Sequence, residues 1–243
     1  MIDAVVFDLD GVLLDSEQLW DEAREQLAAE RGGRWHPQAQ RDMMGMSSTE
    51  WSRYMHETIG LPEPPEQINR EVVERLTAIY RKDLPAIPGA REAVERLTAR
   101  WPLGLASSSN RELIDLVLEL LGVAHLFAAT VSSEEVARGK PAPDVYLEAT
   151  RRLGVDPARA AAVEDSHNGI LSAKAAGMRV LAIPNAHFPP DEEALAQADV
   201  VLDSLAGLTA EAVEPRKRES PTGAASAGSR RRAASSPAPS RPA

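Results

Sequence analysis

The sequence lacks cysteine, and its 243 residues include no apolar stretch as long as a membrane span. Without cysteine there is no disulfide framework and no thiol nucleophile. The N-terminus carries neither the basic region nor the apolar region of a secretory signal. We therefore expect a soluble, cytoplasmic protein with no membrane partner.

Positive charge is also in deficit, since 37 acidic residues face 27 basic ones and the formal net charge is -10. This balance argues against nucleic-acid binding by a folded body. Residues 214–243 differ, with seven Lys or Arg against Glu214 and Glu219, so that this segment carries +5 and the remainder -15. Its Ser, Ala, Pro, Gly and Arg cannot bury enough surface to fold. We predict a disordered basic tail, which is the only hint of a nucleic-acid partner.

Two carboxylates directly follow an apolar run near the N-terminus. The run Ala4-Val5-Val6-Phe7 predicts a short buried strand, and Asp8 and Asp10 come next, with Gly11 as a turn residue. In an open α/β sheet, ligands collect at the carboxyl ends of the strands. One carboxylate there can attack phosphorus as a nucleophile, while a second handles the proton of the leaving group. Taken alone, the pair also fits acids that only end a strand or cap the next segment.

A second apolar run, Leu103 to Ala106, is followed by the polar run Ser107-Ser108-Ser109-Asn110. A hydroxyl at the end of a strand can donate to a phosphoryl oxygen without adding charge. Serine and asparagine also cap helices, and a helix is expected to begin near Arg111. Both roles fit, because the run has more polar residues than one cap needs.

Two later segments add a cation and more acids. Lys140 stands on a loop stiffened by Pro141 and Pro143, which suits a fixed charge for a phosphate, although a solvated surface lysine is the alternative. Glu164 and Asp165 follow a predicted strand at residues 160–163, and carboxylates of this kind bind Mg²⁺. A helix N-cap explains one of these acids well and two adjacent acids less well. Asp8 and Asp165 can share one ion if their strands are neighbours.

Together, and in this order, these four segments resemble the haloacid dehalogenase (HAD) superfamily of phosphohydrolases, from about Ile2 to Leu208. The resemblance implies a Rossmann-like parallel sheet and Mg²⁺-dependent phosphoryl transfer. It implies that Asp8 is the nucleophile and Asp10 the general acid and base. The phosphoryl group would be bound by Ser107 and Lys140, with Ser108 as a further candidate. The metal would be held by Asp8, the backbone carbonyl of Asp10, and Asp165, with Glu164 nearby. True dehalogenases lack the second aspartate, which disfavours carbon–halogen cleavage.

The order of predicted elements divides the chain. Strands and helices alternate from Ala86 onward, which predicts an α/β fold with a parallel sheet. Residues 15–85 predict helices instead, at 16–31, 50–59 and 66–80. An all-helical insert at this place resembles the cap of the HAD subfamily that includes β-phosphoglucomutase and many sugar-phosphate phosphatases. We predict a Rossmann-like core at 1–14 and 86–213, a small helical cap domain at 15–85, and the tail at 214–243.

The helical insert departs from the mutases at two positions. Trp20 stands where β-phosphoglucomutase has a histidine, and Ser48 stands where the mutases carry an arginine for a second phosphate. Trp20 is predicted to form core or pocket wall, and it is a candidate for substrate binding. Both departures favour a simple phosphatase.

We therefore predict a Mg²⁺-dependent phosphomonoester hydrolase, acting through an aspartyl-phosphate on a small sugar- or polyol-like phosphorylated metabolite. A β-phosphoglucomutase-like phosphomutase is the alternative, and a non-catalytic regulatory protein that uses the basic tail is a second one. The expected assembly is a monomer or a weak dimer.

Overall fold

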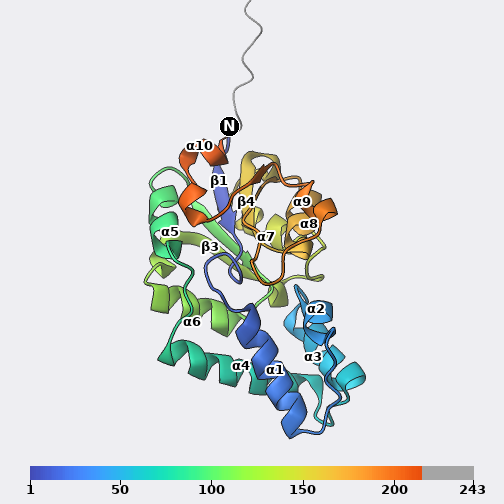
Figure 1. The fold of residues 1–243 in the computed structure, drawn as a ribbon. Coiled ribbons are helices and arrows are strands. Elements are labelled where there is room, and N and C mark those ends of the chain that lie inside the picture. The colour runs from blue at the N-terminus through green and yellow to red at the C-terminus, as the bar shows by residue number, and fades with distance from the viewer. Residues whose placement is uncertain (215–243) are drawn as a thin grey trace, which may run out of the picture.

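A computed structural model describes residues 1–214, so the predicted tail lies, apart from Glu214, outside the described residues. The described chain is built on one parallel sheet with the strand order β3-β2-β1-β4-β5-β6 (Figure 1). The strands are β1 (Ala4–Phe7), β2 (Leu103–Ser107), β3 (Phe127–Ser132), β4 (Ala160–Glu164), β5 (Arg179–Ala182) and β6 (Val200–Val201). The predicted α/β class with a Rossmann-like sheet is confirmed.

Strand β1 lies at the centre of the sheet because it is apolar throughout and buried on both faces. Val5 pairs with Leu103 of β2 on one side and with Ala161 of β4 on the other. The carboxyl ends of β1, β2 and β4 therefore lie side by side. All the polar segments singled out in the sequence at the ends of these strands meet at one edge of the sheet.

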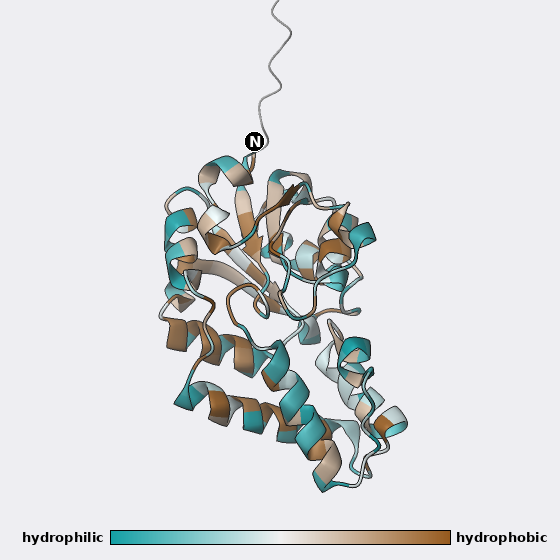
Figure 2. Cartoon of the chain, in the orientation of Figure 1, coloured by the Kyte–Doolittle hydropathy of each residue, from teal (hydrophilic) through white to brown (hydrophobic). Residues whose placement is uncertain are grey.

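Successive residues of β1 enter two separate hydrophobic clusters, because side chains alternate across a strand. Val5 and Phe7 belong to one cluster, and Val6 belongs to the other. The flanking helices are α5 (Ala90–Thr98), α6 (Arg111–Leu121), α7 (Asp144–Leu153), α8 (His167–Ala175), α9 (Glu192–Leu195) and α10 (Ala210–Val213). Figure 2 shows brown and pale strands in the sheet and hydrophilic residues on helices such as α5.

A group of helices follows β1 and lies beyond the carboxyl edge of the sheet (Figure 1). It consists of α1 (Glu17–Glu30), α2 (Ala39–Met43), α3 (Ser48–Tyr54), a π-helical turn (Met55–Ile59) and α4 (Pro65–Lys82). The three long helical stretches expected from the sequence are present. Helix α2 was not expected, because five residues are too few to show a helical period.

The two chain segments that connect these helices to the sheet run together. Leu14, before α1, forms an antiparallel bridge with Ala86, after α4. The predicted domain boundaries fall at these two connections and stay a prediction. No helix within residues 1–214 is long and apolar enough to cross a membrane.

Candidate active site

Three carboxylates converge where β1 and β4 end. Asp8 follows β1, Glu164 is the last residue of β4, and Asp165 comes next. Since Phe7 lies opposite Val163 in the sheet, the side chains that follow are neighbours. One oxygen from each of the three acids lies within 4.8 Å of the others, and all three residues are buried. The strands of Asp8 and Asp165 are therefore adjacent, as sharing one ion would require.

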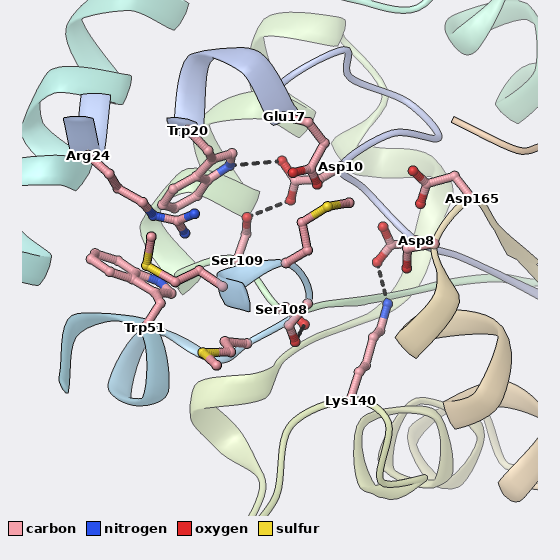
Figure 3. Close-up of a pocket in the computed structure, with 15 residues that line it drawn as sticks. Asp8, Asp10, Glu17, Trp20, Arg24, Trp51, Ser108, Ser109, Lys140 and Asp165 are labelled. Carbon is pink, nitrogen blue, oxygen red and sulfur yellow. Dashed lines mark hydrogen bonds and ion pairs between the residues drawn. The ribbon is translucent and has the colours of Figure 1, made fainter. Parts of the chain in front are cut away.

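Lys140 lies inside this acid cluster rather than on the surface. Its Nζ donates to Asp8 Oδ1 at 2.5 Å and to Glu164 Oε1 at 2.6 Å. The lysine side chain is 3% exposed, which excludes the alternative of a solvated lysine. Figure 3 shows Lys140 reaching up to Asp8 from the loop before α7.

Glu164 is surrounded by donors. Its Oε1 accepts a hydrogen bond from the hydroxyl of Tyr146 at 2.7 Å, in addition to the one from Lys140. Its Oε2 accepts from the backbone N–H groups of Asp165 and Ser166. A Cβ at Gly169 would lie 2.0 Å from the carboxylate of Glu164, so only glycine fits there. Tyr146 was not among the site residues expected from the sequence, where it reads only as an aromatic residue of a helix.

The excess of negative charge changes the acidity of the cluster. Burial, reinforced by the charges of Glu164 and Asp10, raises the pKa of Asp8 well above its ordinary value, although Lys140 opposes this. Burial and the charges of Glu164 and Asp8 likewise raise the pKa of Asp165. Burial alone would lower the pKa of Lys140, but Asp8 and Glu164 outweigh it and raise that pKa. The site holds more buried carboxylates than one ammonium can neutralise.

A divalent cation fits this donor set. The carboxylates offer only oxygen ligands, which suits Mg²⁺. Asp165 Oδ1 is buried without a hydrogen-bond partner, whereas its Oδ2 accepts from Asn185 Nδ2 at 3.3 Å. Gly11 makes room for this carboxylate, because a Cβ at Gly11 would lie 1.8 Å from Asp165 Oδ2. A buried anionic oxygen without a donor is a position that a cation would stabilise.

The carboxyl of Asp10 has a separate set of partners. Its Oδ1 accepts from Ser16 Oγ at 2.5 Å and from Trp20 Nε1 at 3.3 Å. Its Oδ2 accepts from Ser109 Oγ at 2.6 Å. These donors hold the group at the pocket beside Asp8. Ser16 and Ser109 were not assigned these contacts from the sequence, because both come from turns whose approach depends on the fold.

The serine run after β2 divides between fold and pocket. Ser107 is fully buried, and its Oγ accepts from the backbone N–H of Ser109 at 3.0 Å. Ser108 and Ser109 line the pocket, whereas Ser107 does not. Asn110 precedes α6 but makes no side-chain cap to it, and its amide donates to Glu134 instead. The phosphate-binding roles of Ser107 and Ser108 stay predictions.

A small pocket joins the acid cluster to the helical segment. Its accessible cavity is about 50 Å³ in volume. It is lined by Asp8, Asp10, Glu17, Trp20, Arg24, Met43, Met44, Gly45, Met46, Trp51, Ser108, Ser109, Lys140, Asp165 and Ser166. Trp20 therefore forms pocket wall, and its contact with a substrate stays a prediction.

Ser48, which replaces an arginine of the mutases, does not reach the pocket. Ser48 is buried and does not line the pocket, and its Oγ donates to Glu134 Oε1 at 2.8 Å. Glu17 and Arg24 line the pocket but were not among the site residues expected from the sequence. The signal for Arg24 was its position within the apolar face of the helix formed by Trp20, Ala23 and Leu27.

The parallel sheet, the acid cluster and the buried lysine define a hydrolase of the Rossmann-like α/β class. A family model described as a haloacid dehalogenase-like hydrolase matches residues 2–177. The chain belongs to this family and is an enzyme.

Individual relatives agree with this assignment. The chain is 36% identical over 213 residues to hexitol phosphatase B of Escherichia coli (strain K12), covering 85% of this chain and 94% of that protein. It is 33% identical over 203 residues to a phosphorylated carbohydrates phosphatase of Thermotoga maritima, covering 82% and 93%. Among solved structures, a mutant of CbbY from Rhodobacter sphaeroides in complex with xylulose-(1,5)bisphosphate superimposes with a TM-score of 0.80. That match has 29% sequence identity and covers 88% of this chain and 100% of the other.

Proposed function

We propose that the protein is a Mg²⁺-dependent phosphomonoester hydrolase that acts on a small sugar- or polyol-like phosphate through an aspartyl-phosphate. One observation carries this proposal. The Asp8 carboxylate lies in the buried acid cluster beside Lys140, and the Asp10 carboxyl lines the same pocket. A carboxylate suited to act as nucleophile, a carboxyl suited to donate a proton and a cation suited to a phosphoryl group thus share one small cavity.

In the first step, a carboxylate oxygen of Asp8 attacks phosphorus and forms an acyl-phosphate bond. The bond from phosphorus to the substrate oxygen breaks, and Asp10 gives its proton to the leaving alcohol. The hydrogen bonds from Ser16, Trp20 and Ser109 keep Asp10 in one orientation for this transfer. Lys140 neutralises charge on the phosphoryl oxygens.

In the second step, water attacks the phosphorus of the aspartyl-phosphate. Asp10, now ionised, accepts a proton from that water. The acyl-phosphate bond breaks, inorganic phosphate leaves, and the Asp8 carboxylate is restored. The same carboxyl thus acts as acid in one step and base in the other.

The metal would be held by Asp8, Asp165 and the backbone carbonyl of Asp10, with Glu164 behind them. When bound, Mg²⁺ neutralises the charge of the transferring group. The unpartnered Oδ1 of Asp165 supports this assignment.

Residues 15–85 would act as a cap that opens to admit the substrate. The cavity of about 50 Å³ has room for a water molecule or two but not for a sugar phosphate. The paired connections at Leu14 and Ala86 are the natural hinge. Closure would then exclude bulk water from the phosphoryl transfer.

The substrate class is supported by relatives named for hexitol and for phosphorylated carbohydrates. Net hydrolysis is favoured over phosphomutase action. A mutase must hold a second phosphate on its cap, and here Ser48 is turned toward Glu134, away from the pocket. Trp20 donates a hydrogen bond to Asp10 and cannot relay a proton as a histidine does.

Phosphate release from a panel of sugar and polyol phosphates in Mg²⁺ tests the proposal. We expect turnover by the wild type, none by Asp8→Asn, and a loss of about 10²–10⁴ in kcat for Asp10→Asn. Turnover by Asp8→Asn would refute the nucleophile. Conversion of β-glucose 1-phosphate into glucose 6-phosphate without free phosphate would establish the mutase instead.

A further inference from the structure

The end of the pocket that faces the helical segment contains a buried guanidinium with few partners. Arg24 is 5% exposed. Within residues 1–214 its one hydrogen bond runs from Nη1 to Gln40 Oε1, at 3.3 Å, and its Nε has no partner. Burying a charged group is costly unless its donors are hydrogen-bonded, and here one of them is not. An unsatisfied buried donor beside a pocket therefore calls for a functional explanation.

Two tryptophans hold this guanidinium in place. Its central carbon lies 4.6 Å from the ring centroid of Trp20 and 4.7 Å from that of Trp51. Such cation–π contacts use the faces of the planar group and leave the N–H groups on its edge available for hydrogen bonds. Figure 3 shows the guanidinium of Arg24 between the two tryptophans and directed into the pocket. The Arg24 side chain is thus held in place while some of its N–H groups remain available to a ligand.

Glu17 provides an acceptor on the same wall. Glu17, Trp20 and Arg24 are spaced at i, i+3 and i+7, so they share one face of α1, and all three line the pocket. The Gln40 side chain bridges the two ionisable groups, because its Nε2 donates to Glu17 Oε2 at 3.1 Å while its Oε1 accepts from Arg24. Glu17 is thus an acceptor and Arg24 a donor, separated by the neutral amide of Gln40. Together they suit hydroxyl groups, which both donate and accept hydrogen bonds.

The charge of this wall favours a neutral ligand group over a second phosphate. Arg24 and Lys140 are the two cations that line the pocket, and Lys140 is engaged by Asp8 and Glu164. The carboxyl of Glu17 lies on the same wall, close enough to Arg24 for the two charges to interact. In Figure 3 Asp10 lies between Trp20 and Asp8, with the carboxyl of Glu17 next to it. An alcohol protonated by Asp10 can therefore extend its carbon chain past Glu17 toward Arg24.

We propose that Glu17 and Arg24 determine substrate specificity by hydrogen bonding to hydroxyl groups of the leaving alcohol, so that the enzyme selects a polyol chain without a second phosphate. One hydroxyl donates to Glu17 and a neighbouring one accepts from Arg24. This inference rests on the proposed function and specifies its substrate class.

The test compares kcat and KM for glucitol 6-phosphate with those for p-nitrophenyl phosphate, whose leaving group has no further hydroxyl. Arg24→Met should lower kcat/KM for glucitol 6-phosphate about 10- to 100-fold, the value of hydrogen bonds to a charged group. For p-nitrophenyl phosphate the change should stay within about threefold. Arg53→Met, the same substitution at an exposed arginine of α3, is the matched control and should change neither substrate.

Two further variants keep the test informative if Arg24→Met does not fold, as judged by its melting temperature. Arg24→Lys keeps the charge but loses the planar fork, and Glu17→Gln keeps the shape but loses the acid. Both should reduce selectivity for glucitol 6-phosphate over p-nitrophenyl phosphate.

Three results would overturn the inference. An equal fall in kcat/KM of Arg24→Met for both substrates would show that Arg24 supports folding or the chemical step rather than specificity. An unchanged kcat/KM for both would show that Arg24 does not contact the substrate. A wild-type preference for a sugar bisphosphate over glucitol 6-phosphate would show that the wall binds phosphate instead. If the wild type hydrolyses none of these esters, the proposed function itself fails, and the inference with it.

Discussion

At the scale of single residues, the site depends on ionisable groups whose environments differ sharply over a few ångströms. Asp8 and Asp165 lie in a buried cluster that raises their pKa values, whereas Asp10 is held by the neutral donors Ser16, Trp20 and Ser109. Separating the environments of neighbouring carboxyls allows them to take different roles in one reaction. In the proposed reaction, the nucleophile Asp8 and the proton donor Asp10 would therefore stand only two residues apart.

Glu17 should make the free energy of unfolding depend on pH. Burial, reinforced by the charge of Asp10, raises its pKa from 4.5 to about 7. Below pH 4.5 the carboxyl is protonated in both states, so its contribution to stability is fully present. As the pH rises toward 7 only the unfolded chain releases the proton, and stability falls.

The variant Glu17→Gln cannot titrate and should escape this loss. Its stability relative to wild type should therefore increase from pH 4.5 to pH 8, by up to about 3 kcal/mol. Urea denaturation of the metal-free proteins at the two pH values measures the difference. If the stability difference between Glu17→Gln and wild type is the same at both pH values, the Glu17 carboxyl has the same pKa in the folded and unfolded states.

Tyr146 should contribute to stability through Glu164. Tyr146→Phe removes one of the donors to a fully buried carboxylate, and the cost of such a loss is about 1–3 kcal/mol. Tyr54→Phe is the matched control, since the Tyr54 hydroxyl donates to Asp42 in an exposed contact. Chemical denaturation of both variants should show the larger loss for Tyr146→Phe. Equal losses would mean that Glu164 does not depend on this hydroxyl.

At the scale of elements, the turn after β1 determines where the acids can meet. Gly11 has a φ of +79°, and a Cβ there would overlap the carboxylate of Asp165. The turn therefore combines a left-handed conformation with a close approach to the end of β4. Either constraint favours glycine, and together they require it.

Gly11→Ala should lose activity as well as stability. Gly32 is the matched control, because it has a similar φ of +73° but no atom within 4 Å of an added Cβ. Gly32→Ala should cost only the backbone strain, about 1 kcal/mol, with kcat unchanged. Gly11→Ala should also displace Asp165 and reduce phosphate release. Full activity in Gly11→Ala would contradict the proposed arrangement of the metal ligands.

At the scale of the whole molecule, the helical segment and the sheet meet around the pocket. Ser108 Oγ donates to the backbone carbonyl of Gly45, and Asn168 Nδ2 donates to that of Met44. These contacts hold the loop between α2 and α3 against the carboxyl edge of the sheet. The pocket is thus formed by two parts that are far apart in the sequence.

Metal binding should stabilise the whole folded chain, because the three acids come together only in that state. Mg²⁺ at 100 times its dissociation constant should add about 2.7 kcal/mol to the free energy of unfolding, and EDTA should remove this together with activity. Asp165→Asn should weaken the effect, whereas Asp191→Asn, at an exposed acid, should preserve it. A melting temperature of the wild type that is the same with and without Mg²⁺ would contradict the proposed metal site.

Much of the fold and part of the site are local consequences of the sequence. Short apolar runs separated by amphipathic stretches require a parallel sheet, and polar residues directly after such runs must lie at its carboxyl edge. Asp8, Glu164 and Asp165 could therefore be singled out by their positions after such runs, and Lys140 by the two prolines that stiffen its loop. The carboxylates then indicated a divalent metal, and the lysine and hydroxyl groups indicated a phosphoryl group.

Only the tertiary structure decided which of these groups touch. The contacts of Asp10 with Ser109, of Lys140 with Glu164, and of Arg24 with Trp51 join segments tens of residues apart. Ser107 and Ser109 are both buried, but only Ser109 lines the pocket, a difference that a run of identical residues does not reveal. The physical reason is that hydrogen-bond partners and burial depend on the relative placement of whole elements. That placement is set by packing across the sheet, which no single stretch of sequence contains.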